Sequence, residues 1–185
     1  DAAAYARVAH VRQLTGDLEG ALTAIDLATR AVSPRNRGTF AWVWTKRAAY
    51  ELQRGRIDEA LHAADEALAV HPSAAGALAV RGRALLAQGR AGDAVAPLTR
   101  SVEKSPLPDV LWALAEALRA AGRSGDADAV ELRLIGSGEG TDPRGLAVFL
   151  ASRGHDLERA RRLARRELDV RRVVYTWGAL AWGEA

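Results

Sequence analysis

One glycine recurs at nearly regular intervals along the chain, and this repeat limits the possible folds more than any other feature of the sequence. Successive copies lie 39, 34, 33 and 32 residues apart, at Gly16, Gly55, Gly89, Gly122 and Gly154. A repeat of this length is too short to bury a hydrophobic face by itself, so neighbouring repeats must stack. The chain is therefore predicted to be an array of similar stacked units.

Small residues at fixed places around each glycine predict that every unit is a pair of antiparallel helices. Seven residues before the glycine stand Ala9, Ala48, Gly82, Ala115 and Ala147. Five residues after it, or six in the fifth unit, stand Ala21, Ala60, Ala94, Ala127 and Ala160. Small side chains let two helices approach closely, and the glycine supplies the left-handed residue that ends the first helix.

The residues that follow the glycine are typical of the beginning and end of a second helix. An aspartate stands in or beside its first turn in three units, at Asp17, Asp58 and Asp93. A negative charge is favoured there by the helix dipole. A proline follows the helix in three units, at Pro34, Pro72 and Pro106. Proline lacks the N–H that would continue a helix, so the second helix is predicted to stop before it.

The segment from Trp44 to Pro72 resembles the tetratricopeptide repeat family as found in bacterial proteins. It has that family's opening tryptophan, small residue, turn glycine, alanine and closing proline in register. The resemblance covers essentially the whole chain and implies an all-α fold, a right-handed α-solenoid of stacked antiparallel helical hairpins. We expect a single solenoid over residues 1–185, with units at 2–34, 40–72, 74–106, 108–138 and 142–172 and a partial unit at 173–185. Because the chain starts at Asp1 without a methionine, we expect it to be a fragment of a longer chain.

Several residues depart from the family pattern. Charged residues replace packing side chains at Arg47 and Arg81 in first helices and at Glu131 and Glu167 in second helices. The stretch IGSGEGTDP, residues 135–143, is predicted to be a loose connector between the fourth and fifth units. Within it, Thr141 or Asp142 is expected to cap the next helix, with Pro143 at the first helical position.

The resemblance implies a binding function, because the first helices of family members line a concave groove that holds a peptide or an extended segment of another protein. Carried over place by place, the binding residues are His10, Gln13, Trp42, Thr45, Arg83, Leu86, Trp112, Glu116, Arg119 and Arg144. The chain is thus predicted to be a protein–protein interaction module and not an enzyme, with a protein or peptide as its partner.

Two pairs of these residues have alternative roles. Trp42 and Trp112 are either exposed anchors for the bound chain or part of the core. Arg83 and Arg119 either bind a carboxylate of the ligand or pair with neighbouring acidic residues on the surface. Some family members hold a C-terminal carboxylate with two asparagines and several lysines. That clamp is excluded here, because the chain has a single asparagine and two lysines.

Other functions remain open at this point. Self-association as a scaffold or homo-oligomer would use an apolar end that includes Tyr175, Trp177 and Trp182. Another alternative is that the chain is the regulatory portion of a larger protein. Nucleic-acid binding through an arginine-rich helix at residues 159–172 is disfavoured, because acidic residues are interleaved and no aromatic residues alternate with the arginines to stack on bases.

The residue types exclude several kinds of chemistry. The chain has no cysteine, so disulfides and cysteine–zinc sites are ruled out. Its four histidines lie in separate units or turns, and no familiar catalytic motif is present. No catalytic residue, metal site or cofactor is therefore predicted. No segment approaches the roughly 18 consecutive apolar residues of a membrane span, and no secretory signal is visible, so a cytoplasmic location is expected.

Overall fold

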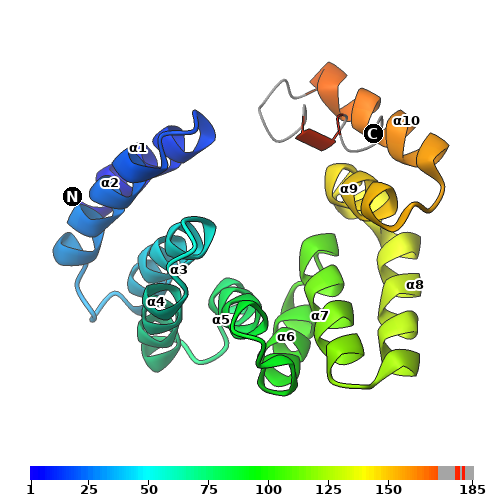
Figure 1. The fold of residues 1–185 in the computed structure, drawn as a ribbon. Coiled ribbons are helices and arrows are strands. Elements are labelled where there is room, and N and C mark those ends of the chain that lie inside the picture. The colour runs from blue at the N-terminus through cyan, green and yellow to red at the C-terminus, as the bar shows by residue number, and fades with distance from the viewer. Residues whose placement is uncertain (171–177, 180, 182–185) are drawn as a thin grey trace. The chain divides into compact units, whose positions relative to one another are not determined.

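The computed structural model describes residues 1–170, 178, 179 and 181, and all regular structure in them is helical (Figure 1). The helices of residues 1–170 are α1 (Ala2–Leu14), α2 (Leu18–Ala31), α3 (Arg37–Gln53), α4 (Ile57–Val70), α5 (Ala75–Ala87), α6 (Ala91–Lys104), α7 (Pro108–Ala120), α8 (Ser124–Thr141), α9 (Pro143–Arg153) and α10 (Leu157–Val170). The predicted all-α fold is confirmed.

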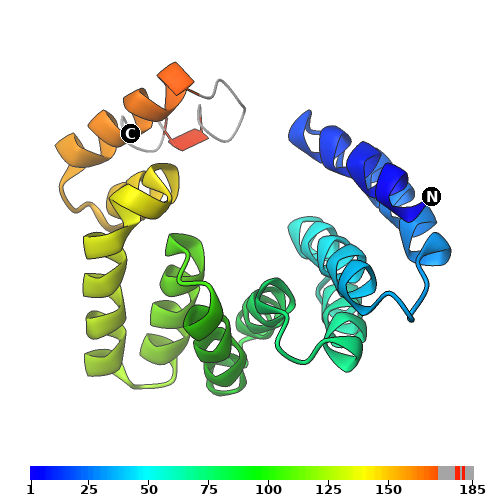
Figure 2. The ribbon, with the colours of Figure 1, turned by 180° about the vertical axis from the view of Figure 1, so that it is seen from behind.

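The chain divides into two compact units, residues 1–105 and 106–185. In the first unit α1 packs on α2, α3 on α4 and α5 on α6, and consecutive hairpins meet through α2 with α3 and α4 with α5 (Figure 2). In the second unit α7 packs on α8 and α9 on α10, and the hairpins meet through α8 and α9. Each unit is thus a stack of hairpins, whereas one continuous solenoid through both units stays a prediction.

The five repeated glycines all have the left-handed conformation that the repeat predicts. Their φ angles are 88°, 81°, 76°, 78° and 64° in chain order. At the turn after α5, the N–H of Gly89 donates to the carbonyl of Leu86 at 2.8 Å, and the N–H of Arg90 donates to that of Leu85 at 2.9 Å. These bonds satisfy carbonyls that the end of the helix leaves free. An L-residue costs about 1–2 kcal/mol in this conformation, so glycine determines where the first helix ends.

The small residues predicted to lie between paired helices are buried. Ala48 in α3 and Ala60 in α4 have no exposed surface. In the next hairpin, a Cβ added at Gly82 of α5 would overlap the side chain of Leu98 in α6. The paired helices therefore meet at positions where one side chain is small or absent, as the sequence indicates.

The predicted loose connector at residues 135–143 is wrong, because α8 continues through most of it to Thr141. Each glycine inside a helix costs about 1 kcal/mol relative to alanine, and packing against α9 offsets this cost. Gly138 is buried at that contact, where a Cβ would stand 3.0 Å from the Cβ of Leu146. The next helix begins as expected, with the side chain of Asp142 accepting a backbone N–H at 3.1 Å.

Candidate functional site

The first helices of the three hairpins in residues 1–105 are neighbours, because α3 contacts both α1 and α5. Nε2 of Gln13 in α1 donates to Oε1 of Gln53 in α3 at 3.3 Å. On the other side, a Cβ at Gly76 of α5 would stand 3.0 Å from Cγ2 of Thr45 in α3. The predicted binding residues of this unit therefore come from adjoining helices: His10, Gln13, Trp42, Thr45, Arg83 and Leu86.

Two tryptophans of α3 have different surroundings. Trp44 is half-buried, with its ring 5.8 Å from that of Phe40 and 6.1 Å from that of His62 in α4. Trp42 is 44% exposed. Tryptophan is usually largely buried, so an indole this exposed is available to a partner.

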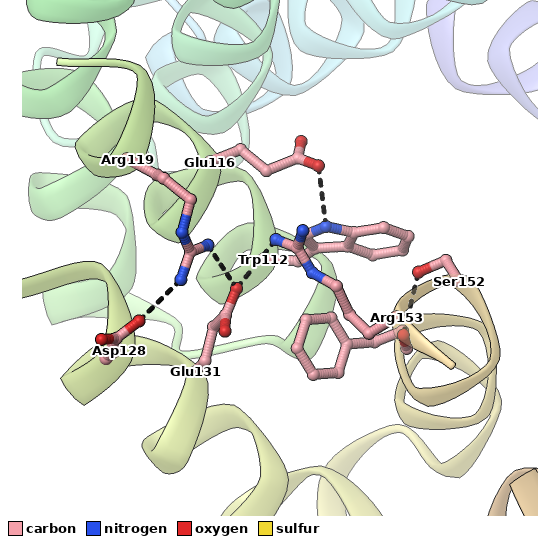
Figure 3. A network of polar contacts seen from close by, with 8 residues as sticks. Trp112, Glu116, Arg119, Asp128, Glu131, Ser152 and Arg153 are labelled. Carbon is pink, nitrogen blue, oxygen red and sulfur yellow. Dashed lines mark hydrogen bonds and ion pairs between the residues drawn. The ribbon is translucent and has the colours of Figure 1, made fainter. Parts of the chain in front are cut away.

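In the second unit, Trp112 of α7 is engaged with its neighbours (Figure 3). Its ring lies 5.6 Å from that of Phe149 in α9 in an edge-to-face arrangement. Its Nε1 donates to Oε1 of Glu116 at 3.0 Å. Both predicted residues thus interact within the unit, and Trp112 is only partly exposed.

Arg119 of α7 is held by two carboxylates of α8 (Figure 3). Its guanidinium donates to Glu131 and to Asp128, each at 2.7 Å. The hydrogen bonds that it donates to Glu131 and, to a lesser extent, Asp128 raise the pKa of Arg119 above its ordinary value. Glu131 also accepts a hydrogen bond from Arg153 of α9 at 2.8 Å. This bridge between three helices explains why a glutamate stands where the family pattern has a packing side chain.

Of the remaining predicted site residues, only Arg144 lies within the described part of the chain. Arg144 is half-buried in the first turn of α9, with its guanidinium 3.9 Å from the carboxylate of Asp142. The predicted end interface, Tyr175, Trp177 and Trp182, lies outside the described residues.

A charged cavity between α2 and α3, which we call the α2–α3 cavity, is not foreseen by the sequence analysis. It has a volume of about 420 Å³. Its lining includes the acidic residues Glu19, Asp26 and Glu51, the basic residues Arg30, Arg47 and Arg56, and the apolar residues Leu22 and Leu27. Arg47 is central, because its guanidinium lies 3.0 Å from Asp26 and 5.3 Å from the centre of the Trp44 ring.

The same pairing recurs at the next hairpin junction, where Arg81 of α5 binds Asp65 of α4 at 2.8 Å. In both cases the arginine precedes its glycine by eight residues and the aspartate follows the previous glycine by ten. The corresponding residues at the α8–α9 junction are Leu132 and Leu146. This spacing is the signal in the sequence that would have paired the unusual arginines with their partners.

The junction between α8 and α9 also has a cavity of about 420 Å³. Its lining includes four apolar side chains, Leu132, Ile135, Phe149 and Leu150. Charged residues, among them Asp128, Asp156 and Arg159, complete the lining of this second cavity, so the two junction cavities share a size and the second has more apolar lining.

The arginines of α10 are partly neutralised by acidic residues of the same unit. Arg159 and Arg166 lie 3.0 and 3.6 Å from the carboxylate of Glu139 in α8. Arg161 binds Glu158 at 2.8 Å. These ion pairs reduce the charge that the helix can offer to phosphates.

Two classes of feature are absent from the part of the chain that the structure describes. No group of three or more histidine or acidic side chains there is arranged to hold a metal ion. No helix there has the length and apolar character needed to cross a membrane.

Comparison with known proteins finds similarity to tetratricopeptide repeat proteins. The tetratricopeptide repeat model matches residues 45–107. The protein TTC0263 of Thermus thermophilus, a thermophilic tetratricopeptide repeat protein, is 17% identical, with 91% of each chain covered and a TM-score of 0.67. YrrB, described as a repeat protein of this kind with an unusual peptide-binding site, is 18% identical, with 100% of this chain and 93% of that chain covered and a TM-score of 0.60.

A third similar structure is the human IFIT1 dimer with PPP-AAAA. It is 16% identical, with a TM-score of 0.68, and the match covers 97% of this chain and 44% of that one. At these identities the likeness is one of fold alone. No curated protein matches the chain significantly.

Proposed function

We propose that the chain binds an extended peptide along α1, α3 and α5. It is a tetratricopeptide repeat protein, and proteins with this fold are in general protein-interaction modules. The exposed indole of Trp42 carries the proposal. Aromatic side chains supply much of the binding energy of protein interfaces, and an exposed tryptophan is suited to that role. The other predicted residues of these helices, His10, Gln13, Thr45, Arg83 and Leu86, are proposed to flank the anchor.

The second unit is a weaker candidate for the main anchor. Trp112 is packed on Phe149 and bonded to Glu116, and Arg119 is bound to two carboxylates. A ligand would have to compete with these contacts, whereas at Trp42 it would cover a surface already facing water. The proposal therefore gives Trp112, Glu116, Arg119 and Arg144 at most a secondary part in binding.

Selection from a random peptide library on the immobilised chain, followed by calorimetry with the selected peptides, tests this function. We expect Trp42→Ala to weaken binding about 30-fold, since a hot-spot residue contributes about 2 kcal/mol. Its melting temperature should fall less than that of Trp112→Ala, because Trp42 is 44% exposed whereas Trp112 is half-buried. Trp112→Ala is the matched control, and it should lower the melting temperature while leaving the affinity nearly intact. Unchanged affinity in Trp42→Ala, or a selection that yields no peptide, would refute the proposed site.

A second candidate function is self-association through α1, supported by its exposed apolar side chains. Large apolar residues are exposed along this helix at Tyr5, Val8, Val11 and Leu14. If a second copy covers them, the mass measured by sedimentation will rise with concentration. The double variant Val8→Lys and Val11→Lys should then stay monomeric at every concentration. A monomeric wild-type chain at high concentration would rule this function out.

A further inference from the structure

We propose that the peptide bound along α1, α3 and α5 is acidic, with carboxylate side chains beside an apolar residue that covers Trp42. This inference rests on the proposed peptide site and names the class of its ligand. Three features carry it: the separation of charge between the first and second helices of residues 1–105, two cations without ion pairs, and the places of both cations in the repeat.

Charge is divided unevenly between the first and second helices of residues 1–105. Together α1, α3 and α5 contain seven arginines and lysines and one acidic residue, Glu51. Glu51 is buried and lies within ion-pair distance of both Arg47 and Arg56, so its charge is already matched. By contrast, α2, α4 and α6 contain eight acidic residues and three basic ones. The first helices are therefore basic, and the second helices are acidic.

Four of the seven cations already have partners within this unit. Two belong to the arginine–aspartate pairs at the hairpin junctions. Arg12 lies 3.8 Å from the carboxylate of Asp17, and Arg37 donates to the carbonyl of Val70 at 2.6 Å. A ligand would have to displace these groups to use the same cations.

Arg7 of α1 and Lys46 of α3 are available to a ligand. Within the part of the chain that the structure describes, neither side chain makes an ion pair or a hydrogen bond. The carboxylate of Asp1, which precedes α1, is occupied in capping that helix, where it accepts the N–H of Ala3 at 2.7 Å. Arg83 of α5 has interactions of its own, so it is not counted with them. A carboxylate of a bound peptide can therefore meet either cation without displacing another.

The repeat indicates where the two cations lie relative to Trp42. Lys46 follows Trp42 by four residues, so their side chains lie one turn apart on the same side of α3. Arg7 and Lys46 each stand two residues before the aligned small residue, Ala9 or Ala48, and so occupy equivalent places on adjoining helices. Packed helices lie about 8–10 Å apart, and an extended chain advances about 3.3 Å per residue. We therefore expect two acidic residues about three positions apart in the peptide.

A basic surface also attracts the phosphates of nucleic acid. Nucleic-acid binding draws on many phosphate contacts, whereas two cations are available here. The acidic second helices would repel a polyanion that extends beyond the first helices. A short acidic segment of a protein therefore fits this surface better.

Selection from a random peptide library on the full chain, followed by calorimetry, tests the proposal. We expect the selected peptides to be richer in Glu and Asp than the library. Each is then compared with its amide counterpart, in which Gln and Asn replace Glu and Asp. The counterpart should bind about fivefold more weakly, since two exposed ion pairs are lost. Added salt should weaken the acidic peptide more than its counterpart.

Charge reversal at the two lysines of the chain locates the effect. Lys46→Glu should weaken binding of the acidic peptides about tenfold, because repulsion replaces attraction. Lys104→Glu is the matched control, because it changes the net charge equally at an exposed position of the second helix α6, and the affinity should be nearly unchanged. If circular dichroism shows that Lys46→Glu is unfolded, Arg7→Glu on α1 decides the question, with the same loss expected.

Four results would overturn the proposal. Selected peptides that depend on Trp42 and bind equally well as amides would exclude an acidic ligand and leave the peptide site in place. A selection that yields no peptide would refute both. Equal effects of Lys46→Glu and Lys104→Glu would show that only net charge matters. A single-stranded oligonucleotide that binds more tightly than the peptides, and is weakened by Lys46→Glu, would show that the partner is a nucleic acid.

Discussion

Arg47 shows how a single residue that breaks a repeat pattern is accommodated by its surroundings. It stands where the family has a leucine, and its guanidinium meets Asp26, Glu51 and the face of Trp44. The sequence identified the departure, and it did not identify the partners, because they lie on another hairpin or one turn away. Only the packing of α2 on α3 brings these charges together.

We expect Arg47→Met to lower the free energy of unfolding by about 2 kcal/mol. The loss is smaller than the roughly 3–5 kcal/mol of a fully buried broken pair, because Arg56 remains beside Glu51. The matched variant Arg81→Met should cost less than about 1 kcal/mol, since its partner Asp65 is well exposed to water. Urea denaturation measures both values, and equal losses would show that the burial of Glu51 does not matter.

Helix α8 shows how packing overrides local sequence. Three glycines, at positions 136, 138 and 140, predict a loose connector, and the structure has helix there. The capping aspartate and the proline after it could be predicted from the sequence, because they act within a few residues. The close approach of α8 to α9 at Gly138 could not be predicted, since it depends on a contact with Leu146 in the next helix.

We expect Gly138→Ala to be less stable than Gly136→Ala by about 1–3 kcal/mol. Both changes gain the same helix propensity, so their difference isolates the cost of overpacking. At Gly136 a Cβ would meet nothing within 4 Å, whereas at Gly138 it would press on Leu146. Thermal unfolding of the two variants provides the comparison, and a stability gain of equal size in both would mean that the helices are not in close contact.

At the scale of the whole molecule, the repeat predicted the hairpins and their order but not the division into two compact units. Hairpin formation depends on contacts within about thirty-five residues, which a repeat spacing encodes directly. The candidate binding surface could be predicted only in part, for the same reason. The family pattern indicates which side of a helix faces a ligand, whereas the exposure of Trp112 depends on its contact with Phe149, which lies far along the chain.

The division predicts that residues 1–105 fold without the rest of the chain. Their hairpins pack on one another, and repeat arrays are stabilised by neighbouring contacts. A fragment of these residues should give a helical circular dichroism spectrum and a single cooperative unfolding transition. A fragment that is disordered in water would show instead that residues 106–185 are needed to complete its core.

The arginine–aspartate pairs make one order of the hairpins more favourable than others, although the hairpins share a similar backbone. A hairpin bearing Arg47 or Arg81 keeps its ion pair only behind a hairpin with an aspartate at the matching place. Spliced behind α8, it would face Leu132 and lose its counterion. Recombination that moves a repeat away from its complementary neighbour would therefore cost an ion pair, whereas duplication of the second hairpin would place Arg47 behind Asp65 and keep one.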